Sequence, residues 1–253
     1  MKEILGIDVG ATGTKGAIVN TKKGVLITER YKIPTPKSKK PEAMADVIKE
    51  ICQHYNWKDQ PVGIGFPAVI KNKMCHTASN IDKSWIGTNI YELLQSKTKC
   101  DVTVINDADA AGIAEMTYGI GRKKSEGIVI LLTLGTGIGS ALFMNGKLIP
   151  NTEFGHLKFK GSIAEKIASN NARKMKKLSW EEYAAELNGF LKHLDFIFSP
   201  DLIILGGGIS KQFDTYSQYL TKNVNVKAAQ HYNNAGIIGA AMSINYYKKN
   251  KGN

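Results

Sequence analysis

The stretch Asp101–Gly112, DVTVINDADAAG, decides the fold. Its first half has the length and the β-branched content of a buried strand. From Ala108 onward alanines recur at helical spacing, so a helix should follow directly. Asp107 therefore stands where a buried strand opens onto a helix, which is where open α/β sheets place ligands. A carboxylate at Asp107 or Asp109 could equally cap that helix, so this stretch alone favours capping and chemistry about equally.

The whole chain has the composition of an ordinary globular protein. Its 253 residues are 43% hydrophobic and 22% charged, which suits one large domain or two lobes. No apolar run is long enough to span a membrane, and the start MKEILGIDVG is typical of a strand and not of a signal peptide. Three cysteines without CxxC spacing, Cys52, Cys75 and Cys100, indicate reduced thiols and a cytoplasmic location.

The net charge of +12 has two interpretations. Basic residues gather in four clusters: Lys37–Lys40, Arg122–Lys124, Arg173–Lys177 and Lys248–Lys251. Such clusters can serve solubility, or they can bind a polyanion such as nucleic acid or a phosphate polymer. Composition alone leaves both open.

The order of predicted elements is that of a mixed α/β protein. Three short strands are expected over 3–9, 15–20 and 24–33, followed by alternating helices and strands up to 101–105. The second half repeats this plan, with a strand at 127–133, a return strand at 140–144, a long helix near 179–198 and a strand at 201–205. Two related lobes around a cleft are therefore expected.

Each half opens with a glycine-rich turn. The first is DVGATGTK, Asp8–Lys15, and the second is LGTGIG, Leu134–Gly139. Glycines let the backbone approach an anion and present its N–H groups, and Thr12, Thr14 and Lys15 add donors and charge. A dinucleotide-binding fingerprint needs a helix after the glycines, but here a strand and the Asn145-Gly146 hairpin signal follow. Either turn alone could be an ordinary hairpin, whereas two at equivalent places favour phosphate binding.

A second group of polar residues could bind a polyhydroxylated ligand. Glu153 and His156 are three residues apart in EFGH, Glu165 begins a predicted helix, and Asn80 lies in a long loop. His156 could instead be a core histidine or a metal ligand, and Glu165 could be an acidic first-turn residue. Amide, carboxylate and imidazole groups together match sugar hydroxyls, each of which donates and accepts hydrogen bonds.

The motifs DVGATGTK, INDADA, LGTGIG, EFGH and LGGGIS, in this order and spacing, resemble the ROK family of sugar kinases. The resemblance covers roughly residues 3–245 and implies the α/β fold of two ribonuclease-H-like lobes shared with actin and hexokinase. TASNIDKSWIG, NDADAAGIAEMTYG, IPNTEFGHL and SPDLIILGGGISK are most similar to the branch of the family that uses inorganic polyphosphate. Where zinc-bearing members have CxCGxxGC, this chain has GSIAEKIAS, so no structural zinc is expected. Because the first strand is expected to begin at residue 3, the helix-turn-helix of the family's repressors is not expected here.

The resemblance implies a role for each matching residue. Asp107 is the general base, and with it five residues bind glucose: Asn80, Asn106, Glu153, His156 and Glu165. The residues implied for phosphate are Asp8, Gly10, Thr12, Gly13, Thr14, Lys15, Gly135, Thr136 and Gly137. Asp8 would act on a Mg²⁺ ion indirectly, and Gly207 and Gly208 match a nucleotide-binding turn that matters only if ATP is a donor.

The resemblance therefore implies a kinase that transfers a phosphoryl group from inorganic polyphosphate to the 6-hydroxyl of glucose. One alternative is an ATP-dependent hexose kinase on the same scaffold, and another is a non-catalytic sugar sensor or nucleic-acid binder. Neither nucleic acid nor a membrane is expected as a partner. The chain is expected to form a homodimer. The small first lobe is expected over 1–107, completed by a C-terminal helix over 236–253, and the large second lobe over 108–235.

Overall fold

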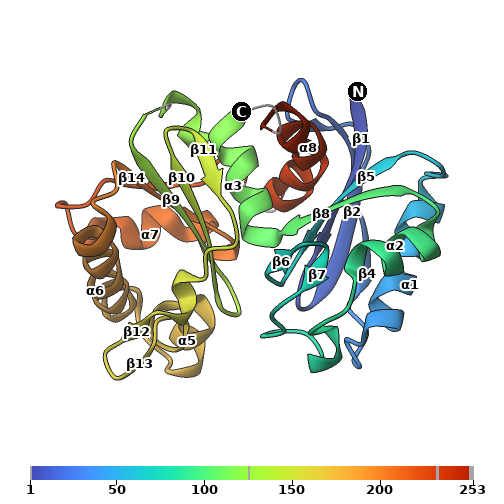
Figure 1. Ribbon diagram of the computed structural model, residues 1–253. Helices are drawn as coiled ribbons and strands as arrows, with labels where there is room; N and C mark the ends of the chain where they lie inside the picture. The colour runs from blue at the N-terminus through green and yellow to red at the C-terminus, as the bar shows by residue number, and fades with distance from the viewer. Residues whose placement is uncertain (1, 125, 232–233, 251–253) are drawn as a thin grey trace. The chain divides into compact units, whose positions relative to one another are not determined.

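The computed structural model describes residues 2–124, 126–231 and 234–250 (Figure 1). The chain divides into two compact units, Met1–Ala114 with Asn234–Asn253 and Glu115–Asn233. The division falls inside helix α3 (Asp107–Thr117), a few residues after the boundary predicted from the sequence. Residues 251–253 of the predicted C-terminal helix lie outside the described residues, as do the side chains of the cluster Lys248–Lys251.

The first unit is built on a mixed sheet in which a β-meander is followed by two parallel strands. The path runs β3-β2-β1-β5-β8, and β4 pairs with β2. Its strands are β1 (Glu3–Val9), β2 (Gly13–Asn20), β3 (Val25–Leu26), β4 (Tyr31–Pro34), β5 (Pro61–Phe66) and β8 (Asp101–Asn106). A small hairpin of β6 (Ile70–Lys71) and β7 (Met74–Cys75) lies after β5. Because β5 and β8 run parallel to β1, all three end at the same edge of the sheet.

The single strand predicted over 24–33 is wrong, because the chain leaves the sheet between β3 and β4. The Thr28 hydroxyl accepts the amide of Ile18 at 3.0 Å, in place of a backbone carbonyl. Tyr55 then holds the break, since its hydroxyl accepts the amide of Tyr31 at 3.0 Å and donates to the carbonyl of Glu29 at 2.7 Å. These are side-chain partners from distant sequence, which a local pattern does not indicate.

Helices cover both faces of this sheet (Figure 1). They are α1 (Pro41–His54), α2 (Ile90–Thr98) and α8 (Ala235–Asn250). The C-terminal helix α8 packs against β1 and β5, where Gly6 and Gly63 are paired neighbours. A Cβ atom on Gly63 would lie 1.8 Å from the carbonyl oxygen of Ala240, and one on Gly6 would lie 2.1 Å from that of Ile237. The two glycines are therefore what allows α8 to lie directly on the sheet.

The second unit repeats the strand order of the first. Its sheet runs β11-β10-β9-β14-β15, again a meander followed by two parallel strands. Its strands are β9 (Ile128–Leu134), β10 (Ile138–Met144), β11 (Lys147–Ile149), β14 (Leu202–Gly206) and β15 (Val226–Ala228), with a small hairpin of β12 (Lys158–Phe159) and β13 (Ser162–Ile163). The predicted α/β class and the repetition of one plan in two halves are confirmed.

One long helix covers the core of the second unit. The helices here are α4 (Glu165–Ala168), α5 (Asn170–Met175), α6 (Trp180–Phe198) and α7 (Phe213–Tyr216). Helix α6 begins after a capping box formed by Ser179 and Glu182, close to the start predicted near residue 179. Its buried face, including Leu187 and Leu191, packs with β9 and β14 in one apolar cluster. Across the described ranges of both units, no helix combines the length and the apolarity that a membrane crossing needs.

Candidate active site

The first glycine-rich turn joins β1 to β2 in the first unit. Asp8 on β1 is opposite Lys15 on β2, and the turn closes with the amide of Gly10 donating to the carbonyl of Gly13 at 3.2 Å. Thr35, just after β4, fixes the turn from the side: its hydroxyl donates to the carbonyl of Gly10 at 2.6 Å, and its amide donates to that of Thr12 at 3.4 Å. Thr35 was not predictable from the sequence, because its hydrogen-bond partners come from a strand pairing that no local motif indicates.

The turn exposes some of its predicted phosphate ligands and buries another. Thr12 is exposed, and Lys15 and Asp8 are half-buried with the Nζ of Lys15 at 3.9 Å from a carboxylate oxygen of Asp8. Burial raises the pKa of the Asp8 carboxyl above its ordinary range, and the Lys15 ammonium offsets part of that rise. Thr14 is only 2% exposed, so its side chain is buried beneath the surface of the turn. Its role as a phosphate ligand stays a prediction.

Asn106 ends strand β8 and caps helix α3. Its Oδ1 accepts the amides of Ala108 at 2.9 Å and Asp109 at 3.1 Å, and its Nδ2 donates to the carbonyl of Ala68 at 3.3 Å. The helix cap for which the sequence offered Asp107 or Asp109 thus belongs to Asn106. Since Asn106 is 6% exposed and most of its hydrogen-bonding capacity is used, at most one Nδ2 hydrogen is left for a ligand.

Asp107 is the first residue of α3 and lies at the carboxyl-end edge of the sheet. Its Oδ1 accepts the amide of Ala108 at 2.8 Å, which holds the carboxylate at the positive end of the helix. The start of this helix lies beside Gly65 on β5, where an added Cβ atom would be 3.6 Å from the Cα of Asp107 and 3.5 Å from the Cβ of Ala110, which is ordinary contact. The side chain is half-buried, as a proton acceptor open to a substrate should be.

Asn80 lies exposed in the loop before the short 3-10 helix Lys83–Trp85. The loop is tied to the segment after β4, since Lys39 Nζ donates to the Asn80 carbonyl at 3.1 Å and the Trp85 indole donates to the Lys39 carbonyl at 3.0 Å. The buried Trp85 ring therefore fixes the backbone on which Asn80 is presented, while the Asn80 side chain stays at the surface.

The second glycine-rich turn joins β9 to β10 in the second unit. The amide of Gly135 donates to the carbonyl of Gly137 at 3.0 Å, and the carbonyl of Gly135 accepts the amide of Asn171 at 3.0 Å. Glu165, the first residue of α4, accepts the amide of Ile138 through its Oε2 at 3.4 Å. Gly135 has no atom within 4 Å of an added Cβ, so the turn presents open backbone.

Three of the predicted sugar-binding side chains form one cluster in the second unit. His156 Nδ1 lies 3.2 Å from Glu153 Oε2, and His156 Nε2 lies 4.0 Å from Glu165 Oε1. Burial raises the pKa of Glu153; the imidazole of His156 lowers it, and the carboxylate of Glu165 raises it further. The cluster stays partly open to solvent, so its carboxylates can still accept hydrogen bonds from a ligand.

Two small residues set the backbone of this cluster. The Ser140 hydroxyl accepts the amide of Phe154 and donates to the carbonyl of Thr152, both at 2.9 Å, and so ties the segment around Glu153 to β10. A Cβ atom on Gly155 would lie 2.3 Å from the carbonyl oxygen of Ile138. The glycine in EFGH is thus needed for close packing of the 3-10 helix Phe154–His156 on β10.

Gly207 and Gly208 follow β14, as predicted. Gly207 has φ of 79°, and an added Cβ would lie 3.0 Å from the amide nitrogen of Leu134. This residue brings the turn after β14 against the end of β9. Gly208 opens the 3-10 helix Gly208–Gln212 and has no atom within 4 Å of an added Cβ.

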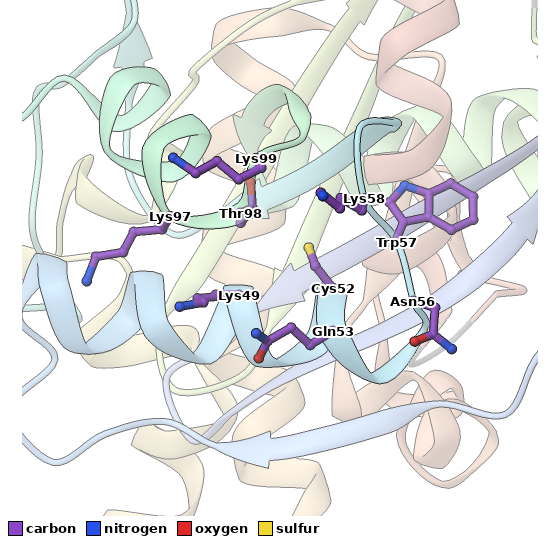
Figure 2. A pocket seen from close by; sticks show the side chains of 9 residues that line it. All are labelled: Lys49, Cys52, Gln53, Asn56, Trp57, Lys58, Lys97, Thr98 and Lys99. Atoms are coloured by element: carbon purple, nitrogen blue, oxygen red, sulfur yellow. The ribbon is translucent and has the colours of Figure 1, made fainter.

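A separate cavity of about 570 Å³ lies between the C-terminal ends of α1 and α2 and contains none of the predicted site residues (Figure 2). Cys52 and Trp57 lie buried along it, and its lysines are Lys49, Lys58, Lys97 and Lys99. Lys97 is already paired with Glu42 at 2.7 Å and Asp46 at 2.8 Å. Lys97 also lies in the last turn of α2, where a cation complements the helix dipole.

The profile of the ROK family matches residues 4–166. This chain belongs to the ROK family. It is 43% identical to a polyphosphate glucokinase of Mycobacterium leprae, over 94% of this chain and 73% of the relative. It is 44% identical to a polyphosphate glucokinase of Mycobacterium tuberculosis, over 94% of this chain and 89% of the relative.

Solved structures share the fold of this chain. An inorganic polyphosphate/ATP-glucomannokinase from Arthrobacter sp. strain KM superposes with a TM-score of 0.93 at 44% identity, over 97% of this chain and 99% of that one. A ROK family glucokinase from Streptomyces griseus, in complex with glucose and AMPPNP, superposes with a TM-score of 0.79 at 22% identity, over 94% of this chain and 98% of that one. The fold is therefore the two-lobe fold of actin and hexokinase, with one ribonuclease-H-like sheet in each unit.

Proposed function

We propose that this ROK chain is a phosphotransferase that moves a phosphoryl group from inorganic polyphosphate to the 6-hydroxyl of glucose, giving glucose 6-phosphate. The observation that carries the proposal is the 43–44% identity, over 94% of the chain, to proteins named polyphosphate glucokinase. The fold by itself would not select a substrate. The presence in this chain of a carboxylate at Asp107 and of two phosphate-type turns supports the same reaction.

Asp107 is the proposed general base. An alcohol becomes a good nucleophile only as its proton leaves, and a positioned carboxylate contributes about 10²–10⁴-fold to such a step. The hydrogen bond from the Ala108 amide orients the Asp107 carboxylate, which is the proposed acceptor of the proton of the 6-hydroxyl. As the bond between the 6-oxygen and the terminal phosphorus forms, the bond from that phosphorus to its bridging oxygen breaks, and polyphosphate one unit shorter leaves with the electron pair. Asp107 then holds the proton of the 6-hydroxyl and returns it to solvent when glucose 6-phosphate leaves.

Glu153, His156 and Glu165 are the proposed ligands of the sugar hydroxyls, together with Asn80 and one Nδ2 hydrogen of Asn106. The imidazole of His156 lies 3.2 Å from the carboxylate of Glu153 and 4.0 Å from that of Glu165, so the three side chains form a compact set of acceptors and donors. Such a set matches neighbouring hydroxyls, because each hydroxyl both donates and accepts.

The backbone amides of Gly10–Gly13 and Gly135–Gly137, with Thr12, Thr136 and Lys15, are proposed to bind the donor phosphates. Phosphoryl transfer also calls for Mg²⁺, which is held in proteins through one or two carboxylates plus substrate phosphates and water. Asp8 fits that requirement, since it is a half-buried carboxylate beside the phosphate-type turn. Within the described residues, no three His, Cys, Asp or Glu side chains form a metal cage, so Mg²⁺ here would depend on the donor phosphates. The ion would neutralise charge on the transferred group.

A parallel assay of donors tests the proposal. Glucose phosphorylation is expected with long-chain polyphosphate as sole donor, and ATP tested beside it shows whether Gly207 and Gly208 serve a nucleotide. Both donors stand in the name of the Arthrobacter glucomannokinase, which makes ATP a specific second candidate. Turnover with ATP alone would overturn the polyphosphate assignment and leave the ATP-dependent alternative.

The pKa of Glu153 predicts a pH dependence of glucose binding. A carboxyl group loses its charge as the pH falls through its pKa, and burial places that pKa above the ordinary range of glutamate. The KM for glucose should therefore rise on acidification at a higher pH than an exposed glutamate would cause. Kinetics across the acidic range should show this rise for the wild type and a nearly flat KM for Glu153→Gln.

The control for this pH effect is Glu181→Gln, at an exposed residue of the first turn of α6. It should keep the wild-type profile. If Glu153→Gln also keeps the wild-type pH profile of the KM for glucose, a different group titrates, and the proposal that Glu153 binds glucose is wrong.

We further propose a cytoplasmic homodimer. Cys52, Cys75 and Cys100 are free and buried, which is typical of a reducing compartment. Light scattering of the purified chain measures its oligomeric state.

A further inference from the structure

A row of three charged residues crosses the first unit's sheet beside the phosphate-type turn. Asp8 on β1 is paired in register with Lys15 on β2, and Lys15 is paired in register with Lys32 on β4. Residues directly opposite each other in antiparallel strands place their side chains on the same face, with Cβ atoms about 4.5–5.5 Å apart. One carboxylate and two ammonium groups therefore share one face of the sheet.

The side chain of Lys32 lies over the end of the turn. A Cβ atom on Gly13 would be 2.6 Å from the Cε of Lys32 and 3.6 Å from its Cγ. Lys32 is exposed, and its Nζ is bonded to that Cε, so the ammonium lies near Gly13 and is open to solvent. Lys32 can occupy this position because Gly13 has no side chain.

The charges in this row are not balanced. Lys15 has Asp8 at 3.9 Å, but among the residues that the structure describes no carboxylate lies within ion-pair distance of Lys32. Like charges directly opposite on neighbouring strands destabilise a sheet. An anion bound at the turn would remove this cost, and a phosphate chain is an anion of that kind.

Strand β4 is fixed at the right place for such a role. Thr35, three residues after Lys32, is hydrogen-bonded to the carbonyls of Gly10 and Thr12, and Gly13 is paired in register with Pro34. Strand β4 therefore contacts the chain before Gly13, through Thr35, and after Gly13, where Lys32 pairs with Lys15. Its position does not depend on a flexible loop.

We propose that Lys32 is a further donor-binding residue, whose ammonium binds the non-bridging oxygens of the polyphosphate chain at the Gly10–Gly13 turn. Lysine suits this role as a point charge that recognises phosphate without a fixed angular pattern. This inference rests on the proposed function, because it takes polyphosphate as the donor. Lys32 binds the donor and takes no part in proton transfer.

The test compares Lys32→Gln with Lys32→Arg, and with Lys22→Gln as control. Lys22 is exposed in the turn at the other end of strand β2, away from Gly13. Lys32→Gln should raise the KM for polyphosphate about 5- to 10-fold, as the loss of one partly exposed charge contact would. The KM for glucose should stay unchanged, Lys32→Arg should restore most of the donor affinity, and Lys22→Gln should behave as the wild type.

Two further measurements separate donor binding from a structural role. The KM for polyphosphate of Lys32→Gln should depend less steeply on KCl than that of the wild type, because one screened contact is gone. Its Tm without donor should be equal or slightly higher, since a like-charge pair has been removed. A fall in Tm together with equal rises in both KM values would assign Lys32 to the structure of β4 and overturn the proposal.

Direct binding keeps the inference separable from the proposed function. Calorimetry with tripolyphosphate and no glucose should give a weaker Kd for Lys32→Gln than for the wild type. If the wild type binds tripolyphosphate but transfers no phosphoryl group from polyphosphate, the proposed function fails while Lys32 is still tested. If both proteins bind tripolyphosphate equally, Lys32 is not a donor ligand.

Discussion

Replacing Asp107 by Asn should lower kcat for glucose phosphorylation by about 10²–10⁴-fold, because the amide has no basic oxygen to take the proton of the 6-hydroxyl. The change is nearly isosteric, and the new side-chain amide would still accept the backbone N–H of Ala108 through its oxygen. The start of α3 should therefore stay folded, and glucose binding should be reduced much less than turnover. Steady-state kinetics, with glucose affinity from calorimetry, separate the two quantities.

Asp101→Asn is the matched control for this prediction. Asp101 is an exposed residue at the opposite end of the same strand β8, so the substitution removes the same charge far along the strand from α3. It should keep nearly full activity. If Asp107→Asn retains a kcat within a few-fold of the wild type, another group accepts the proton.

The position of Asp107 was predictable from the sequence because it depends on local chemistry. An apolar β-branched run followed by alanines at helical spacing fixes where β8 ends and α3 begins. Which of Asn106 and Asp109 caps helix α3 was not predictable in the same way. Both residue types can cap a helix. Only the structure shows that the Oδ1 of Asn106 accepts two backbone amides of the first turn.

The residues that could not be predicted from the sequence depend on contacts between positions far apart in the chain. Thr35 reaches the turn at Gly10 only because β4 pairs with β2, and Lys32 lies over Gly13 for the same reason. The cluster of Glu153 and His156 was predicted from a spacing of three, which a single turn of 3-10 helix brings together. Its third member, Glu165, joins them through packing that no spacing indicates.

The packing of α8 on the first unit's sheet predicts a second large effect. Gly63→Ala should destabilise the protein by about 3 kcal/mol or more, because the new methyl group would lie 1.8 Å from the carbonyl oxygen of Ala240. A backbone carbonyl inside a helix does not turn aside as a side chain does, so α8 has to move away from β5 as a whole. Thermal unfolding should show a Tm lower by on the order of 10 °C, or the variant should fail to fold.

Gly65→Ala distinguishes close packing from a general intolerance of alanine in β5. Residues 63 and 65 lie on the same face of the strand, but a Cβ on Gly65 would meet its nearest neighbour, Ala110 Cβ, at 3.5 Å, which is ordinary contact. Its Tm should therefore stay close to that of the wild type, helped by the lower entropy of an unfolded chain without that glycine. Equal losses of stability in the two variants would mean that β5 needs glycine for its backbone and that the approach of α8 is not the reason. With the expected difference, the Gly6–Gly63 pair is what lets a helix from the end of the chain complete the unit that holds Asp8 and Asp107.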